Sequence, residues 1–145
     1  MPDREERFEE IYCCLRSLAS GFIREYIGEG NDQLVDDMFT SNDGRYIYVS
    51  RPSFADVVAI DVNSGEIVWR TPVEGLRSDH SAISPDGKTF LVSASTARKV
   101  QAIDVSTGEI IGSFESGDQP HENIYSEDGK KIYHASIGKV FFASP

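Results

Sequence analysis

Carboxylate and imidazole side chains recur at one position of the sequence. Three Asp-Gly pairs end at Gly44, Gly87 and Gly129. The residues eight and seven positions before these glycines are Asp36-Asp37, Asp79-His80 and His121-Glu122. Two of the chain's three histidines fall in this set. Oxygen and imidazole donors bind divalent metal ions, and they also act as general acids and bases.

This set of acidic and imidazole residues leads to two functional hypotheses. The candidate catalytic residues are Asp37, His80, His121 and Glu122. The same four side chains are the candidate ligands of a divalent metal ion. The candidate ligand-binding residues are the remaining two acids and two loop arginines that can meet an anion: Asp36, Asp79, Arg51 and Arg98. The alternative is that all of these side chains are solvated loop residues in a carboxylate-rich chain.

Other chemistry-bearing residues are expected to be structural. Asp79-His80-Ser81 is not predicted to be a catalytic triad, because consecutive strand residues point to opposite faces. His134 lies among apolar strand positions and is expected to be a hydrogen-bonded histidine near the core. Trp69 is expected to pack between repeats. The carboxylates that precede Ser/Thr-Gly turns are expected to accept hydrogen bonds from backbone N–H groups; they are Asp61 and Asp104.

An internal repeat supplies the elements that position these residues. Residues 59–66 and 102–109 share the pattern Ala-Ile-Asp-Val-x-Ser/Thr-Gly-Glu at an offset of 43, the same offset that separates the first two Asp-Gly pairs. Turn residues divide each repeat into short β-branched and aromatic runs. In the second repeat these runs predict strands at 80–84, 89–94, 100–105 and 109–114. The chain is therefore predicted to be all-β, built from four-stranded antiparallel propeller blades.

Three segments resemble a known family of repeats. Residues 46–50 (Tyr-Ile-Tyr-Val-Ser), 84–88 (Ser-Pro-Asp-Gly-Lys) and 102–109 are similar to YVTN-type repeats of the lactonase-like, quinoprotein-like β-propellers. The resemblance implies either a binding scaffold or a lactonase- or lyase-like enzyme that uses the Asp/His/Glu site. The tryptophan-containing motif of quinone-cofactor blades is absent, so a quinone cofactor is not supported.

The length of the chain accommodates only part of a closed propeller. The predicted organisation is a polar tail (1–10), a degenerate half blade or an amphipathic helix (11–30), two blades (31–75 and 76–117) and an incomplete blade (118–145). At 43 residues a repeat this makes about 3.4 repeats, whereas closed propellers have about four to eight blades. We therefore expect self-association or additional blades from a longer chain.

Charge and composition limit the classes of partner. The formal net charge is −10, which disfavours nucleic acid and anionic membrane surfaces. The acidic N-terminus is not followed by an apolar stretch long enough for a signal peptide, and no apolar run approaches the length of a membrane span, so a cytoplasmic location is expected. The predicted function is binding of a small molecule or divalent ion at the mouth of the propeller channel and assembly with further blades.

Overall fold

The computed structural model describes residues 37–138. They belong to the larger of two compact units, which spans Leu34–Pro145. The predicted tail and the half blade or helix over 11–30 lie outside the described residues, as do Asp36 and the last residues of the predicted incomplete blade, 139–145.

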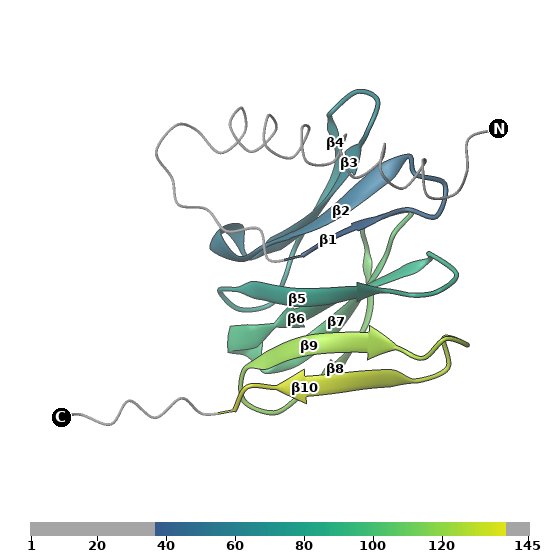
Figure 1. Ribbon diagram of the computed structural model, residues 1–145. Coiled ribbons are helices and arrows are strands. Elements are labelled where there is room, and N and C mark those ends of the chain that lie inside the picture. The colour runs from purple at the N-terminus through teal and green to yellow at the C-terminus, as the bar shows by residue number, and fades with distance from the viewer. Residues whose placement is uncertain (1–36, 139–145) are drawn as a thin grey trace. The chain divides into compact units, whose positions relative to one another are not determined.

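The described residues form three antiparallel sheets (Figure 1). The first contains β1 (Met38–Thr40), β2 (Tyr46–Arg51), β3 (Asp56–Asp61) and β4 (Ile67–Pro72) in that order. The second contains β5 (Ser78–Ile83), β6 (Thr89–Ala94), β7 (Lys99–Asp104) and β8 (Ile110–Glu115). The third pairs β9 (Pro120–Tyr125) with β10 (Ile132–Ser136). Within residues 37–138 the only helices are the 3₁₀ turns Pro52–Phe54 and Ser95–Ala97. The predicted all-β class with four-stranded antiparallel blades is confirmed.

A Ser-x-Asp-Gly turn joins the first two strands of every sheet. Between β5 and β6, the Ser84 hydroxyl donates to Asp86 Oδ1 at 2.6 Å and accepts from the Thr89 N–H at 2.9 Å. Gly87 closes the turn at φ 71°, a conformation that costs glycine little. The hydroxyl lowers the pKa of Asp86, and the equivalent aspartates Asp43 and Asp128 share both the contact and the shift.

The second kind of turn, between the third and fourth strands, is closed by a carboxylate. Asp61 Oδ1 accepts from the N–H of Asn63 at 2.9 Å, and Asp104 Oδ1 accepts from the N–H of Ser106 at 2.8 Å. The pKa of Asp61 is lowered mainly by the hydrogen bond from the Ser64 N–H, with a further contribution from that of Asn63, and the pKa of Asp104 is lowered mainly by the Ser106 hydroxyl, followed by the Ser106 N–H. The predicted structural role of the two aspartates is confirmed.

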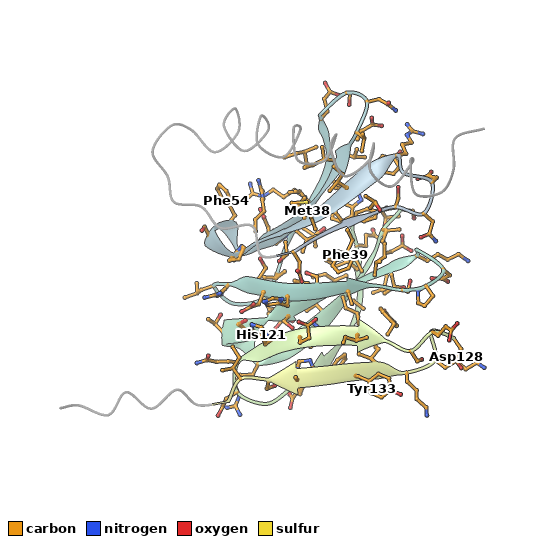
Figure 2. The ribbon with its side chains drawn as sticks, viewed as in Figure 1. Met38, Phe39, Phe54, His121, Asp128 and Tyr133 are labelled. Atoms are coloured by element: carbon orange, nitrogen blue, oxygen red, sulfur yellow. The ribbon has the colours of Figure 1, made fainter. Side chains whose placement is uncertain are left out.

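The main apolar core lies between the first and second sheets. Tyr48 and Phe90, which are 3% and 0% exposed, contribute aromatic rings from β2 and β6. Phe39 projects from β1 toward the second sheet and meets Phe90 edge-on at 5.9 Å (Figure 2). Trp69 stacks on Tyr48, and its indole N–H donates at 2.9 Å to the carbonyl of Val105, in the turn that follows β7 of the second sheet. The prediction that Trp69 packs between repeats is therefore confirmed.

The sheets of the described residues do not close into a ring. All 6 residues of β8 are exposed, and so are the residues of β10 except His134. Large apolar side chains on these strands and on β9 lie open to solvent: Ile110, Ile111, Phe114, Ile124, Ile132 and Tyr133. Across residues 37–138, no helix is long and apolar enough to cross a membrane.

Candidate functional site

Irregular pairing at the start of two neighbouring strands presents the site. In β5, Ser78 pairs with Ala94 and Ser81 with Val92, so Asp79 and His80 together oppose one residue of β6. In β9, the register shifts at the equivalent point, beside His121. Such bulges bend a strand and redirect its side chains. The expected alternation is therefore wrong for Asp79 and His80, whose side chains approach each other.

Hydrogen bonds from the second strand of one sheet hold the first strand of the next. The Ser50 hydroxyl on β2 donates to the carbonyl of Asp79 at 3.0 Å. The Ser93 hydroxyl on β6 donates in the same way to the carbonyl of His121 at 2.8 Å. Equivalent serine-to-carbonyl hydrogen bonds between neighbouring sheets therefore hold the backbone of the strand residues that carry the candidate ligands.

Three potential ligands face one another at this point. His80 Nε2 is 3.9 Å and His121 Nε2 is 4.0 Å from Asp79 Oδ1. One ligand atom from each of these residues lies within 4.8 Å of the other two. The two imidazole rings are tilted by 37° with centroids 3.9 Å apart. Two nitrogens and one oxygen therefore surround a single point.

Asp79 is held rigidly. Its side chain is 6% exposed, and Oδ2 lies 2.8 Å from the Ser95 hydroxyl and 3.3 Å from Arg77 Nε. Oδ1 accepts the backbone N–H of His80 at 3.0 Å and also faces the two imidazoles. The sequence predicts Asp79 as a ligand-binding residue, but nothing in its spacing identifies Ser95 or Arg77 as its supports.

Two further carboxylates face the other side of the His80 ring. Asp37 Oδ2 and Glu122 Oε2 lie 3.5 and 3.6 Å from His80 Nδ1. Asp37 Oδ2 also accepts the backbone N–H of Ser81 at 2.7 Å, which ties β5 to the residue before β1. Carboxylates at Nδ1 favour the tautomer with its proton there, which leaves the Nε2 lone pair directed at Asp79 and His121.

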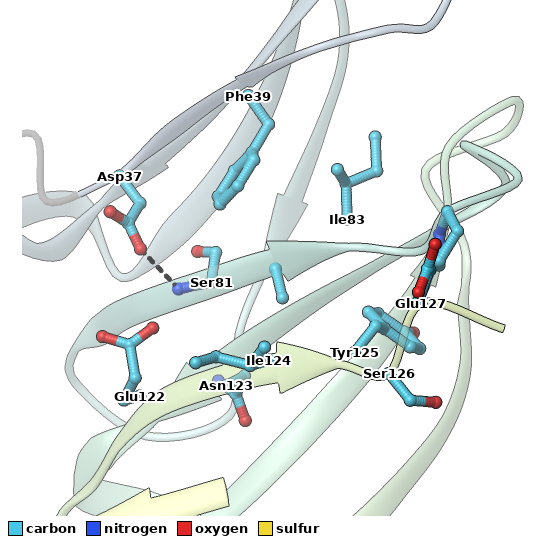
Figure 3. Close-up of a pocket in the computed structure, with 12 residues that line it drawn as sticks. Asp37, Phe39, Ser81, Ile83, Glu122, Asn123, Ile124, Tyr125, Ser126 and Glu127 are labelled. Carbon is cyan, nitrogen blue, oxygen red and sulfur yellow. Dashed lines mark hydrogen bonds between the residues drawn. The ribbon is translucent and has the colours of Figure 1, made fainter. Parts of the chain in front are cut away.

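An open groove of about 470 Å³ adjoins the cluster (Figure 3). Asp37, Ser81 and Glu122 line one end, and Tyr125 and Glu127 line the other. Its walls include the apolar side chains of Phe39, Ile83 and Ile124. The groove has room for a small molecule beside the carboxylates.

The two arginines predicted to bind a ligand lie elsewhere and have carboxylate partners. Arg51 forms a two-point ion pair with buried Asp56, with both N···O distances 2.8 Å, and its side chain is 10% exposed. Arg70 also contacts Asp56. Arg98 Nε lies 2.9 Å from Asp118 Oδ1, and its side chain is 64% exposed. The structure does not bring either predicted arginine to the His80–His121 cluster.

The third histidine belongs to a separate hydrogen-bond network. His134 Nδ1 lies 3.0 Å from Asn123 Oδ1, and Nε2 lies 2.5 Å from Ser116 Oγ. Burial lowers the pKa of His134, while a hydrogen bond to the Glu122 backbone acts in the opposite direction. The prediction of a hydrogen-bonded histidine near the core is confirmed, and the partners are a hydroxyl group and an amide group from two other segments of the chain.

Comparisons with known proteins identify the architecture. No family model matches the chain, and no curated protein matches it. Among solved structures it is similar to a chain of Kuenenia stuttgartiensis hydrazine synthase, a β-propeller-containing protein, with a TM-score of 0.63 and 24% identity. The match covers 75% of this chain and 32% of that chain. These are propeller-like blades.

The likeness defines the fold only. This chain spans about a third of the length of the hydrazine synthase chain, and the identity of the two sequences is low. Propeller folds host unrelated functions, so the activity has to be argued from the site itself. The YVTN and lactonase-like resemblance stays a prediction, because no family model supports it.

Proposed function

We propose that this chain is part of a β-propeller repeat protein that binds a divalent metal ion at the channel mouth through Asp79, His80 and His121. The observation that carries the proposal is the convergence of one ligand atom from each residue within 4.8 Å of the other two. Donors about 2.0–2.1 Å from a tetrahedral zinc ion lie about 3.3 Å apart. A small inward movement of the two imidazoles would therefore place three protein ligands in the tetrahedral coordination sphere of the ion. The fourth coordination position would stay open to water or a small ligand.

The surrounding charges support a cation at this point. Asp37 and Glu122 flank the His80 ring at 3.5 and 3.6 Å, and Arg77 Nε lies 3.3 Å from the Oδ2 atom of Asp79, on the oxygen that does not face the imidazoles. A metal-bound histidine usually donates its second N–H to a carboxylate, which fixes the ring and strengthens the ligand. In the proposed site Asp37 and Glu122 have that positioning role, and Asp79 supplies the oxygen ligand.

The donor set favours one class of metal. Two imidazole nitrogens and one carboxylate oxygen suit zinc and the neighbouring first-row transition metals. Calcium and magnesium prefer sites made of oxygen ligands alone. We therefore expect the site to select Zn²⁺, Co²⁺ or Ni²⁺ over Ca²⁺ and Mg²⁺. The adjoining groove would hold the organic part of any small ligand bound to the ion.

Metal content and calorimetry test this function. Chelator-treated protein is titrated with Zn²⁺, and bound metal is counted after gel filtration. We expect one ion per chain, with affinity lowered at least tenfold in His80→Gln and in His121→Gln. The exposed Glu109→Gln variant removes one negative charge and serves as the control. Equal zinc affinity in a folded His80→Gln/His121→Gln double variant would disprove the site.

The proposal includes assembly with further blades. It is supported by the exposed side chains of Ile124 and Tyr133, which pair directly on one face of β9 and β10, because a neighbouring blade in a propeller covers such a face. The unpaired edge of β10 among the described residues is a second place where another strand can add.

A further inference from the structure

A serine, a histidine and an asparagine form a relay at the other face of β9. Ser116 Oγ, directly after β8, lies 2.5 Å from His134 Nε2 on β10. His134 Nδ1 lies 3.0 Å from Asn123 Oδ1 on β9. The hydroxyl of Ser136 lies 2.8 Å from Ser116 Oγ and 3.1 Å from His134 Nε2. This order of hydroxyl, imidazole and side-chain oxygen is the order that activates a nucleophile in hydrolases.

The hydrogen-bond partners of Asn123 determine which ring nitrogen of neutral His134 carries the proton. Its Nδ2 group donates to the carbonyl of His80 at 3.2 Å and to Ser93 Oγ at 2.8 Å. A carbonyl only accepts hydrogen bonds, so the amide nitrogen must face His80 and the amide oxygen must face His134. His134 Nδ1 therefore carries the proton in the neutral ring. Nε2 is left as an acceptor for a serine hydroxyl.

The repeat shows that the fold does not require these polar groups. Ser116 occupies the position of Val73, since both follow the fourth strand and donate their N–H to the equivalent carbonyl. His134 and Ser136 occupy the positions of Val92 and Ala94, which pair in the same register one repeat earlier. All three apolar counterparts belong to the core between the first two sheets: Val73, Val92 and Ala94. Between the second and third sheets, a Ser–His–Ser group therefore takes the place of the apolar packing cluster found between the first and second sheets.

Solvent and a small ligand can reach this group. Ser136 is exposed, and Ser116 and His134 are partly exposed. Gly117 has no side chain there, and a Cβ at that position would lie 3.3 Å from Ser136 Oγ. Phe114, 38% exposed, meets the His134 ring edge-on at 5.9 Å. An apolar wall beside a hydroxyl suits the acyl group of a small ester.

We propose that Ser116 is a nucleophile that transfers acyl groups from small esters to water, with His134 as its general base and Asn123 as the residue that positions His134. Ser116 Oγ bonds to the ester carbonyl carbon while its proton passes to His134 Nε2. The carbon–alkoxide bond breaks, and the alkoxide takes that proton and leaves as the alcohol. Water then attacks the acyl carbon, giving a proton to Nε2. The bond to Ser116 Oγ breaks, the serine is reprotonated, and a carboxylic acid is released.

A covalent probe tests Ser116 directly. The whole chain is treated with a fluorophosphonate in the presence of a chelator, and the modified peptide is located by mass spectrometry. We expect one phosphonyl group on Ser116, absent in Ser116→Ala and retained in Ser113→Ala, which removes an exposed serine of β8 outside the relay. Hydrolysis of 4-nitrophenyl acetate should follow the same pattern. The chelator separates this result from the metal site, whose failure would leave the labelling unchanged.

Variants of His134 and Asn123 test whether Ser116 reacts because His134 activates it or only because its hydroxyl is accessible to the probe. His134→Gln keeps a polar side chain but loses the base, and we expect labelling to slow at least tenfold because general bases contribute about 10²–10⁴. Asn123→Asp and Asn123→Leu both lose the Nδ2 donor, but only aspartate keeps an acceptor for Nδ1. Labelling should persist in the first and fall in the second. Absence of labelling in the wild-type chain, modification of Ser136 instead, or equal rates in wild type and a folded His134→Gln would overturn the proposal.

Discussion

At the residue scale, the two nitrogens of His80 have different partners. Nε2 faces Asp79 and His121, whereas Nδ1 faces Asp37 and Glu122 at 3.5 and 3.6 Å. If Nε2 binds the ion, the carboxylates at Nδ1 affect affinity without touching the metal. This division distinguishes a ligand from a residue that positions it.

The Asp37→Asn variant tests that division. Asparagine keeps the size of the side chain and an acceptor for the Ser81 N–H, but it removes the negative charge beside His80. We expect zinc affinity, measured by calorimetry, to fall about 10- to 100-fold, while one ion per chain still binds. Loss of all binding would make Asp37 a ligand, and unchanged affinity would remove its positioning role.

The lowered pKa of His134 makes stability depend on pH. Burial disfavours the charged ring in the folded protein, so the unfolded chain takes up the proton first as the pH falls. Unfolding free energy should therefore decrease as the pH drops below about 6.5, the usual histidine value, toward the lower folded pKa. Denaturant titrations at several pH values measure this slope. In His134→Gln the part of this pH dependence that comes from His134 should disappear. An unchanged slope in the variant would contradict the prediction.

The residue types of the candidate site are readable from sequence, but their arrangement is not. The Asp-Gly spacing places His80, His121 and Glu122 at matched positions, and the structure brings them together. The approach of Asp79 to His80 depends on a bulge, an extra residue against β6 that no spacing reveals. The Ser116–His134–Asn123 relay joins residues from three segments. The sequence shows His134 only as an exception to an apolar pattern.

At the element scale, the Ser/Thr-Gly turns do more than connect strands. Gly65 and Gly108 occupy equivalent turns with φ of 72° and 76°. The Gly108 turn lies against the Trp69 ring, where an added Cβ would be 2.7 Å from Cδ2. At Gly65 no atom lies within 4 Å of such a Cβ. One turn is therefore part of the packing between sheets, and the other is open.

Alanine at these two glycines provides a matched comparison. Both substitutions force a side chain into the left-handed region, which costs about 1–2 kcal/mol. Gly108→Ala must also displace Trp69, so it should cost about 1–3 kcal/mol more than Gly65→Ala. Chemical denaturation measures both losses. Equal losses would show that the contact between Gly108 and Trp69 contributes little to the packing of the blades.

The positions of the strands are the feature that the sequence predicts best. β-Branched and aromatic runs bounded by Asp-Gly and Thr-Gly identify β6 and β7 within a residue or two of their observed ends. The sequence places the first strand of the second repeat less well, since it predicts a start at His80 whereas β5 begins at Ser78. Its first residues carry little β-propensity, and they are held by contacts with other sheets, such as the bond from Ser50 to Asp79.

At the scale of the whole molecule, the described sheets leave an apolar face open. Ile124 and Tyr133 pair directly across β9 and β10, so they share one face of the third sheet, and they are 57% and 58% exposed. We expect the chain to associate with itself or with further blades through this face, and we expect multi-angle light scattering to detect concentration-dependent growth in mass. Ile124→Lys/Tyr133→Lys should shift the distribution toward monomer. A wild-type chain that stays monomeric at all concentrations would contradict this expectation.

The central claim is that His80 and His121 bind one divalent ion together. Long-range ¹H–¹⁵N correlation spectra of the histidine rings during a Zn²⁺ titration test it most directly, because coordination moves the resonance of the bound nitrogen. The account predicts that Nε2 of His80 and Nε2 of His121 shift together and saturate at one equivalent, while the resonances of His134 stay in place. Unmoved His80 and His121 resonances at excess zinc, or a shift of only one of the two, would contradict it.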